Sequence, residues 1–109
     1  MAAEKNFENK IKKYIKELGG YHIKYWAGSQ FTKSGVPDLI CCINGYYVAI
    51  EVKAQNGKPS ELQLYNIDKI REAGGFAFVA YPSAWEELKN ILYDLSKGYY
   101  NRETPVILK

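Results

Sequence analysis

The chain has 109 residues, of which 15 are basic and 12 acidic, so its formal net charge is +3. At about 150 residues per domain this length leaves room for one core, and the 47% hydrophobic content is typical of a folded domain rather than of a disordered segment. No stretch approaches the roughly 20 apolar residues of a membrane-spanning helix, and the lysine-rich first residues lack the apolar run of a signal peptide. The adjacent cysteines Cys41 and Cys42 offer neither a disulfide framework nor metal-ligand spacing. We therefore expect one domain over residues 1–109, a cytoplasmic location and no membrane partner, while the mild basicity permits a nucleic-acid partner.

Glycine and proline residues divide the chain into segments, and the first segment predicts a helix over residues 4–18. Its apolar residues recur at helical spacing and form one stripe: Phe7, Ile11, Tyr14, Ile15 and Leu18. The glycine pair at residues 19–20 ends this helix. Residues 21–26 alternate in polarity and predict a strand, and residues 27–36 are polar and contain glycine, as is typical of a loop.

The next two segments predict a β-hairpin. Residues 38–43 and 46–53 are rich in strand-forming side chains, and Asn44-Gly45 separates them. This dipeptide favours positive φ at both positions, which a type I′ hairpin turn requires. One face of the hairpin then carries Leu39, Cys41, Ile43, Val48, Ile50 and Val52, and the other carries Ile40, Cys42, Tyr47 and Ala49. Because both sets are apolar, we expect both faces to be buried.

A second helix is predicted over residues 60–73. Ser60 and Gln63 form a capping box at its start. Gln63 also precedes Ile67 and Ile70 at the spacing of one helix face, so its amide points inward and needs hydrogen-bond partners.

The remaining segments predict a strand, a helix and a short strand. Residues 76–81 form a continuous apolar run that ends at a proline. Ser83 with Glu86 makes another capping box, which opens a helix that ends near residue 96, and residues 106–108 add a short strand. The order αβββαβα predicts an α/β fold in which a mixed central sheet is flanked by helices.

Three charged side chains meet at the open end of the predicted hairpin. The register places Asp38 opposite Glu51, with the Cβ atoms about 4.5–5.5 Å apart, and Lys53 projects from the same face. Two carboxylates at that distance repel each other, and a divalent cation removes the conflict. Oxygen ligands of this kind suit Mg²⁺, and the backbone carbonyl of Val52 can join them if the strand end is open. Lys53 places a positive charge where a phosphoryl transition state gathers negative charge.

These residues form a pattern that resembles a known family. Gly35-Val36-Pro37-Asp38, then Glu51-Val52-Lys53, then a helix bearing Gln63, resembles the PD-(D/E)XK nuclease superfamily. More narrowly, residues 6–81 look like the stand-alone phage and bacterial VRR-NUC (virus-type replication-repair nuclease) domains, relatives of Holliday junction resolvases. The resemblance implies a restriction-endonuclease-like αβββαβ core. It also implies an endonuclease that hydrolyses DNA phosphodiester bonds with Mg²⁺, for which Mn²⁺ can substitute, in a bacterial or phage-infected cell.

The resemblance also implies a glutamate ligand from the first helix. Glu8 lies at the edge of the core-facing stripe and is assigned as a metal ligand beside Asp38 and Glu51, with Glu4 as the reserve. For Gln63 the resemblance implies that it orients the lysine, the attacking water or a phosphate. The alternatives are a Glu8 that is merely solvated and a Gln63 that only caps its helix.

The sequence also suggests contacts with DNA and with a second copy of the chain. Ser29, Gln30 and Lys33, in the loop before the hairpin, are candidate contacts to the DNA backbone. A domain of this size is smaller than a four-way junction and carries one site, so a C2 homodimer would place two sites in matched orientation on branched DNA. The resemblance points to the same dimeric, junction-selective nuclease. Tyr99 and Tyr100 follow the last helix and would pack under a partner subunit or stack on unpaired bases.

Two other functions stay open. One is a restriction-like or nicking nuclease that acts on other DNA structures, and the other is a catalytically silent DNA-binding module with a nuclease fold. The second is disfavoured because every core motif position is filled. Four lysines of the first helix are interpreted as a solvated face that could also contact phosphates: Lys10, Lys12, Lys13 and Lys16.

Overall fold

The computed structural model describes residues 2–26 and 33–109, so the predicted DNA contacts Ser29 and Gln30 lie outside the described residues. The elements in these ranges are, in chain order, α1 (Ala2–Glu17), β1 (Tyr21–Lys24), β2 (Leu39–Ile43), β3 (Tyr46–Val52), α2 (Glu61–Glu72), β4 (Phe76–Ala80), a 3₁₀ turn (Pro82–Ala84), α3 (Trp85–Ser96) and β5 (Ile107–Leu108). None of the helices in these ranges is long and apolar enough to cross a membrane.

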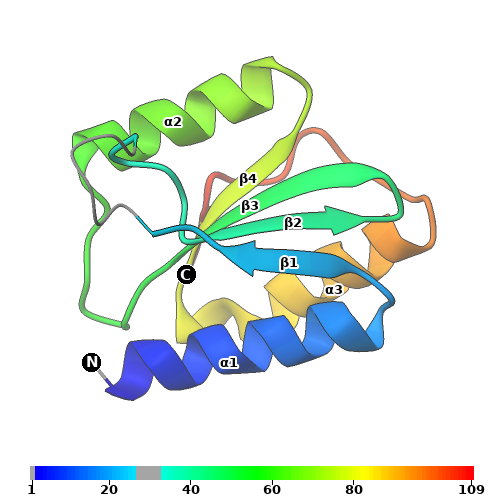
Figure 1. Cartoon of the computed structure of the whole chain (residues 1–109), viewed down its shortest axis with the longest axis horizontal. Coiled ribbons are helices and arrows are strands. Elements are labelled where there is room, and N and C mark those ends of the chain that lie inside the picture. The colour runs from blue at the N-terminus through cyan, green and yellow to red at the C-terminus, as the bar shows by residue number, and fades with distance from the viewer. Residues whose placement is uncertain (1, 27–32) are drawn as a thin grey trace.

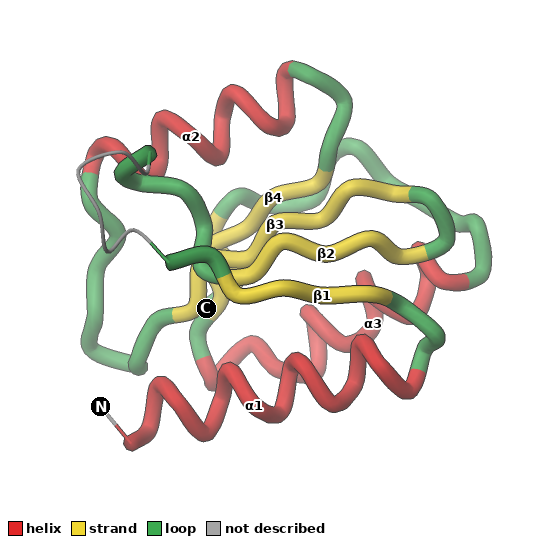
Figure 2. The backbone as a smooth tube through the Cα atoms, in the orientation of Figure 1, coloured by secondary structure: helices red, strands yellow, loops and turns green. Residues whose placement is uncertain are grey.

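The strands form one mixed sheet that lies between helices (Figure 1). The strand order is β1-β2-β3-β4-β5, with antiparallel pairs from β1 to β3 and parallel pairs from β3 to β5. Helix α2 connects β3 to β4 across one face of the sheet, whereas α1 and α3 cover the other face (Figures 1 and 2). This arrangement confirms the predicted α/β fold with its αβββαβ core.

The hairpin of β2 and β3 has the predicted register. Asn44 and Gly45 both have positive φ, as the two-residue turn requires. Leu39 pairs with Ile50 at the far end of the hairpin. The residue before β2 therefore lies beside the penultimate residue of β3, which brings the predicted carboxylate pair together.

The two faces of the hairpin are buried to different extents. One face packs entirely in the core between the sheet and helices α1 and α3: Leu39, Cys41, Ile43, Val48, Ile50 and Val52. The prediction that the other face is also buried is wrong near the turn, where Cys42 and Tyr47 are exposed. Helix α2 packs Ile67 against Ala49 and its neighbours in β4, and so leaves the β1–β2 side of this face uncovered.

The predicted start of α2 is confirmed. The Ser60 hydroxyl accepts a hydrogen bond from the Gln63 amide at 3.1 Å, and Gln63 Oε1 accepts one from the Ser60 amide at 2.9 Å. This capping box places the Gln63 side chain in the first turn of α2, at the end of the sheet where β3 finishes.

The predicted capping box of α3 is wrong. The Ser83 amide donates to Gln55 Oε1 at 2.9 Å, and the Ser83 hydroxyl accepts from Gln55 Nε2 at 2.8 Å. Because Gln55 engages both groups of Ser83, the serine does not pair with Glu86. The chain makes a 3₁₀ turn there instead, and α3 begins without a side-chain cap.

Candidate active site

Asp38 and Glu51 lie side by side where β2 begins and β3 ends. Asp38 is held from both sides by backbone groups: its Oδ2 accepts from the Val52 amide at 3.0 Å, and its carbonyl accepts from the Tyr25 amide at 2.8 Å. The strands on either side therefore fix the position of the aspartate. The hairpin register brings the two carboxyl groups together, and the charge of Asp38 lies close enough to help raise the pKa of Glu51.

Glu51 is a buried carboxyl group with an unsatisfied oxygen. The residue is 2% exposed. Its Oε2 contacts the Lys53 Nζ at 3.4 Å and accepts from Gln63 Nε2 at 3.2 Å, whereas its Oε1 is buried and has no hydrogen-bond partner among the described residues. Burial, and after it the charge of Asp38, raises the pKa of Glu51 to about 8. The carboxylate form of Glu51 therefore needs an additional positive charge.

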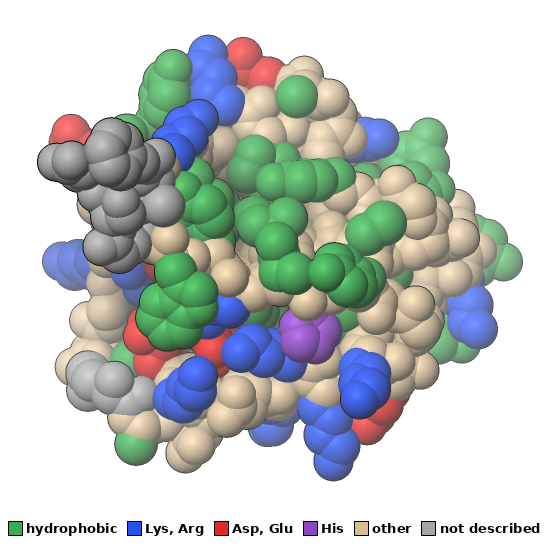
Figure 3. Space-filling model, viewed as in Figure 1, with side chains coloured by type: hydrophobic (Ala, Val, Ile, Leu, Met, Phe, Trp, Pro, Cys, Tyr) green, Lys and Arg blue, Asp and Glu red, His purple; other side chains and the backbone are tan. Residues whose placement is uncertain are grey.

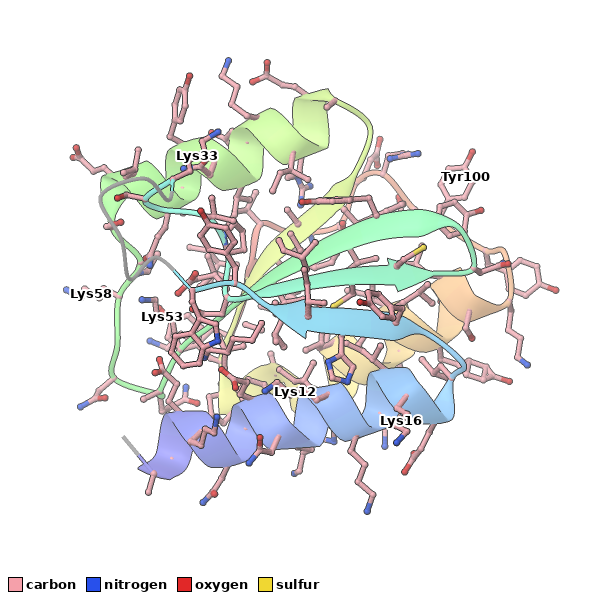
Figure 4. The ribbon with its side chains drawn as sticks, viewed as in Figure 1. Lys12, Lys16, Lys33, Lys53, Lys58 and Tyr100 are labelled. Atoms are coloured by element: carbon pink, nitrogen blue, oxygen red, sulfur yellow. The ribbon has the colours of Figure 1, made fainter. Side chains whose placement is uncertain are left out.

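Lys53 and Gln63 both contact Glu51, of which only the approach of Lys53 was predicted. Lys53 follows β3 and its amide donates to the Ala80 carbonyl at 3.0 Å, so the parallel β3–β4 pairing continues past the end of the strand. Figure 4 shows Lys53 at this end of the sheet, on the side of the loop that carries Lys58. Gln63 uses its oxygen for the capping box and its nitrogen for Glu51. The capping interpretation of Gln63 is therefore confirmed, whereas its role in orienting the lysine, the attacking water or a phosphate stays a prediction.

The loop before Asp38 is anchored on α2 by a residue that sequence reasoning missed. Asn66 is buried, and its Nδ2 donates to the Leu62 carbonyl at 2.9 Å and approaches the Ser34 carbonyl at 3.5 Å. Gly35 has φ +77°, and a Cβ there would lie 2.5 Å from the Leu62 side chain. The glycine of the motif is thus required both for its backbone conformation and for its close approach to α2.

Glu8 lies apart from this pair, among lysines. The residue is 2% exposed. Its Oε1 is bound by Lys24 of β1, and its Oε2 contacts Lys12 at 2.9 Å and Lys5 at 3.4 Å. Burial alone would raise the pKa of Glu8, but the hydrogen bonds from Lys24 and Lys12 outweigh it and lower the pKa to about 2. The structure therefore does not bring Glu8 together with the hairpin carboxylates, and the lysines satisfy its charge.

Two further predicted residues lie at the edges of the site. Lys33 is exposed, and its carbonyl accepts from the Tyr25 hydroxyl at 2.8 Å. The Val52 amide donates to Asp38, and the prediction that the Val52 carbonyl binds metal stays a prediction.

Lys24, which binds Glu8, was missed by sequence reasoning, although its alternation with Ile23 in β1 already indicates an inward side chain.

The oxygen donors of this end of the hairpin fit a divalent cation. Within residues 2–26 and 33–109, no group of three or more His, Cys, Asp or Glu side chains is gathered for a metal, so the set consists of Asp38 and Glu51. Mg²⁺ is commonly held by one or two carboxylates, with water and phosphate oxygens completing its shell. The unsatisfied Oε1 of Glu51 supplies the observation on which the fit rests.

Comparison with known proteins agrees with this geometry. The family model described as the VRR-NUC domain matches residues 2–84, which include every element from α1 to the 3₁₀ turn. No curated protein matches the chain.

Proposed function

Because the chain belongs to the VRR-NUC family, which are nucleases of the PD-(D/E)XK type, we propose that it is a metal-dependent endonuclease that hydrolyses phosphodiester bonds in branched DNA. The observation that carries the metal dependence is the buried Glu51, with one unsatisfied oxygen and with Asp38 beside it. Asp38 and Glu51 would hold Mg²⁺ or Mn²⁺, with the Val52 carbonyl as a further donor. The bound cation would polarise the scissile phosphate and lower the pKa of an attacking water.

Lys53 and Gln63 supply the remaining functions of the site. The Lys53 ammonium lies beside Glu51, so it can offset the negative charge that develops on the phosphate in the transition state. Gln63 binds the same oxygen of Glu51 from α2 and so fixes the orientation of that carboxylate. With the capping box holding its own amide oxygen, Gln63 has little freedom to turn away.

The experiment compares a labelled four-way junction with a linear duplex and a flap, each incubated with Mg²⁺, Mn²⁺ or chelator. We expect cleavage of the junction in the presence of either metal and none with chelator. Lys89, which pairs with Glu86 on α3 at the same 3.4 Å as Lys53 with Glu51, gives a matched control. Lys53→Ala should lose cleavage and Lys89→Ala should keep it. Cleavage that persists in Lys53→Ala would contradict the assigned site.

The other functions are separate outcomes of this experiment. Cleavage of the linear duplex in preference to the junction would indicate a restriction-like or nicking nuclease. Tight binding to all three DNAs without cleavage in any metal would indicate a DNA-binding module. Each outcome replaces one part of the proposal and is visible on the same gel.

The proposal includes a homodimer as the active form. The described chain has a radius of gyration of 12.9 Å, which is small for a four-way junction, and two matched sites require a second copy. An apolar surface on the uncovered side of β1 and β2 supports this: Tyr21, Ile23 and Tyr47 are each between 46% and 68% exposed there (Figure 3). Sedimentation should give a dimer. Ile23→Glu should weaken it, whereas Ile107→Glu, equally exposed on the opposite edge strand, should not.

A further inference from the structure

We propose that four basic side chains along α1 and β1 form a binding surface for the DNA backbone that leads to the cleavage site. These residues, named here the α1–β1 strip, are Lys12, Lys16, His22 and Lys24. The inference rests on the proposed nuclease function and deepens it, since it assigns a phosphate-binding surface outside the carboxylate site. DNA phosphodiester groups are the ligand that the strip would take.

The fold brings the strip together by a tight turn between the helix and the edge strand. A Cβ at Gly20 would lie 2.9 Å from the Ile15 side chain and 3.2 Å from the Cys42 carbonyl, so only glycine lets β1 return this closely along α1. In β1 the side chains alternate: Tyr21 and Ile23 are exposed on the open face, and His22 and Lys24 point toward α1. The strip therefore combines every second residue of β1 with one side of the helix.

The carboxylate of Glu8 contacts two lysines of the strip, Lys12 and Lys24, and the neighbouring Lys5. One carboxylate contacts three ammonium groups, from Lys5, Lys12 and Lys24. Because Glu8 carries a single negative charge, this group keeps a net charge of about +2 at neutral pH. The carboxylate thus fixes the lysines in place without neutralising them.

The strip continues in both directions from this cluster. Lys16 lies one helical turn beyond Lys12, a rise of about 6 Å along the axis. Burial, and after it the nearby charges of Lys12 and Lys16, lowers the pKa of His22, so both lysines lie close to the histidine. At the other end, Lys24 lies near Asp38. The backbone amide of Tyr25, the residue after Lys24, donates to the Asp38 carbonyl. Figure 3 shows lysine side chains and the histidine along the boundary between α1 and the sheet, and Figure 4 labels Lys12 and Lys16 on α1.

Other lysines of the described residues show what distinguishes the strip. Lys69 and Lys89 are each paired with one glutamate of their own helix, so their charges are matched one to one. Cations outnumber carboxylates in the α1–β1 strip, and it ends at the proposed site of cleavage. Ammonium groups on a phosphate backbone position DNA without reading its sequence, which suits a nuclease that selects structure.

The experiment measures DNA affinity in chelator, so that no cleavage occurs, as a function of salt concentration. Each lysine that contacts a phosphate contributes about 0.9 to the slope of log affinity against log salt on duplex DNA. Lys12→Ala/Lys16→Ala should lower this slope by about 2 and weaken binding at least about tenfold at low salt. Lys89→Ala/Lys97→Ala removes the same charge from α3 and from the residue that follows it, and should leave the slope unchanged.

Lys12 contacts Glu8, so its loss could also disturb the fold. Two further variants therefore separate an effect on DNA binding from an effect on folding. Lys16 makes no such contact among the described ion pairs, so Lys16→Ala should keep the fold and lower the slope by about 1. Lys12→Arg/Lys16→Arg should restore the wild-type slope. If the strip and control variants lose affinity equally, or if neither does while the wild type still cleaves DNA, the strip is wrong and the nuclease function stands. A wild type that neither binds nor cleaves DNA overturns both.

Discussion

Two glutamates of this molecule have the same exposure and opposite electrostatic surroundings. Glu8 and Glu51 are each 2% exposed. Lysines contact both oxygens of Glu8 and lower its pKa to about 2, whereas burial and Asp38 raise the pKa of Glu51 to about 8. The comparison shows that burial alone does not mark a metal ligand. We propose Glu51 as the metal ligand because it contacts a single lysine and keeps one buried oxygen without a partner among the described residues.

The largest expected effect comes from removing the buried carboxylate of Glu51. Glu51→Gln keeps the shape and the contact with Gln63 but removes a charge from the proposed metal site. Cleavage of the junction should fall by at least about 10³-fold. The control Glu72→Gln removes an exposed carboxylate that pairs with Lys69 on α2, and a nuclease assay should find it fully active. Equal activity of both variants would remove Glu51 from the site.

Loss of the neighbouring ammonium should have the next largest effect. Lys53→Ala should lower the cleavage rate by about 10²–10³-fold, because it removes the charge that offsets the transition state. Thermal unfolding and DNA binding should stay close to the wild type, since the Lys53 backbone amide keeps its bond to Ala80. Unfolding of the variant at low temperature would instead make Lys53 a structural residue.

The raised pKa of Glu51 predicts a pH-dependent stability in metal-free protein. The folded state holds its proton up to about pH 8, whereas the unfolded state loses it near pH 4.5. The contribution of this group to the free energy of unfolding is therefore favourable at low pH and declines as pH rises from about 4.5 through 8. Glu51→Gln should be more thermostable than the wild type at pH 9 and nearly equal at pH 4. A parallel pH dependence in both proteins would contradict the shift.

Glu8→Gln should lower the stability of the folded protein. Its lowered pKa stabilises the fold above pH 4.5, and this contribution is lost as pH falls through about 2. At pH 7 the variant should unfold with a free energy lower by about 1–3 kcal/mol, because three lysines lose their carboxylate. The difference from the wild type in denaturant melts should vanish near pH 2.

The same variant sharpens the comparison with Glu51. If Glu8 only anchors lysines, Mg²⁺ should still raise the melting temperature of Glu8→Gln by as much as it does for the wild type. Loss of the Mg²⁺ effect would make Glu8 a third ligand, as the first-helix assignment predicts.

The smallest effect is expected at Gln63. Gln63→Ala removes one half of the capping box and the bond to Glu51, which should cost about 1 kcal/mol of stability and about tenfold in cleavage rate. Gln63→Glu keeps the acceptor for the Ser60 amide but replaces the donor to Glu51 with a carboxylate. It should therefore keep the stability of α2 at pH 7 and cleave DNA somewhat more slowly than Gln63→Ala does. Equal cleavage rates in Gln63→Ala and Gln63→Glu would contradict the contact with Glu51.

The carboxylate pair could be predicted from the sequence because one local signal determines it. The Asn44-Gly45 turn sets the hairpin register, and the register alone brings Asp38 to Glu51. The capping role of Gln63 was predictable for a similar reason, since capping depends on residues close in the chain, whereas its contact with Glu51 was not predicted.

Features that depend on distant residues were not predicted. Lysines from two elements converge on Glu8, whereas the sequence pattern of the helix indicates only a solvated lysine face. Cys42 is exposed because α2 is too far along the sheet to cover it, and Ser83 does not cap α3 because Gln55 engages it. Each depends on how whole elements pack rather than on local periodicity.

The central claim, that Glu51 is a buried metal ligand whose Oε1 the protein leaves without a partner, is tested most directly by calorimetric titration of Mg²⁺ at pH 7 in buffers of different ionisation enthalpy. With a pKa of about 8, Glu51 is mainly protonated in the metal-free protein and must lose its proton to bind the ion. We predict the release of close to one proton per Mg²⁺ bound, and neither binding nor release in Glu51→Gln. Binding of Mg²⁺ without proton release, or with the same release in Glu51→Gln, would contradict the account.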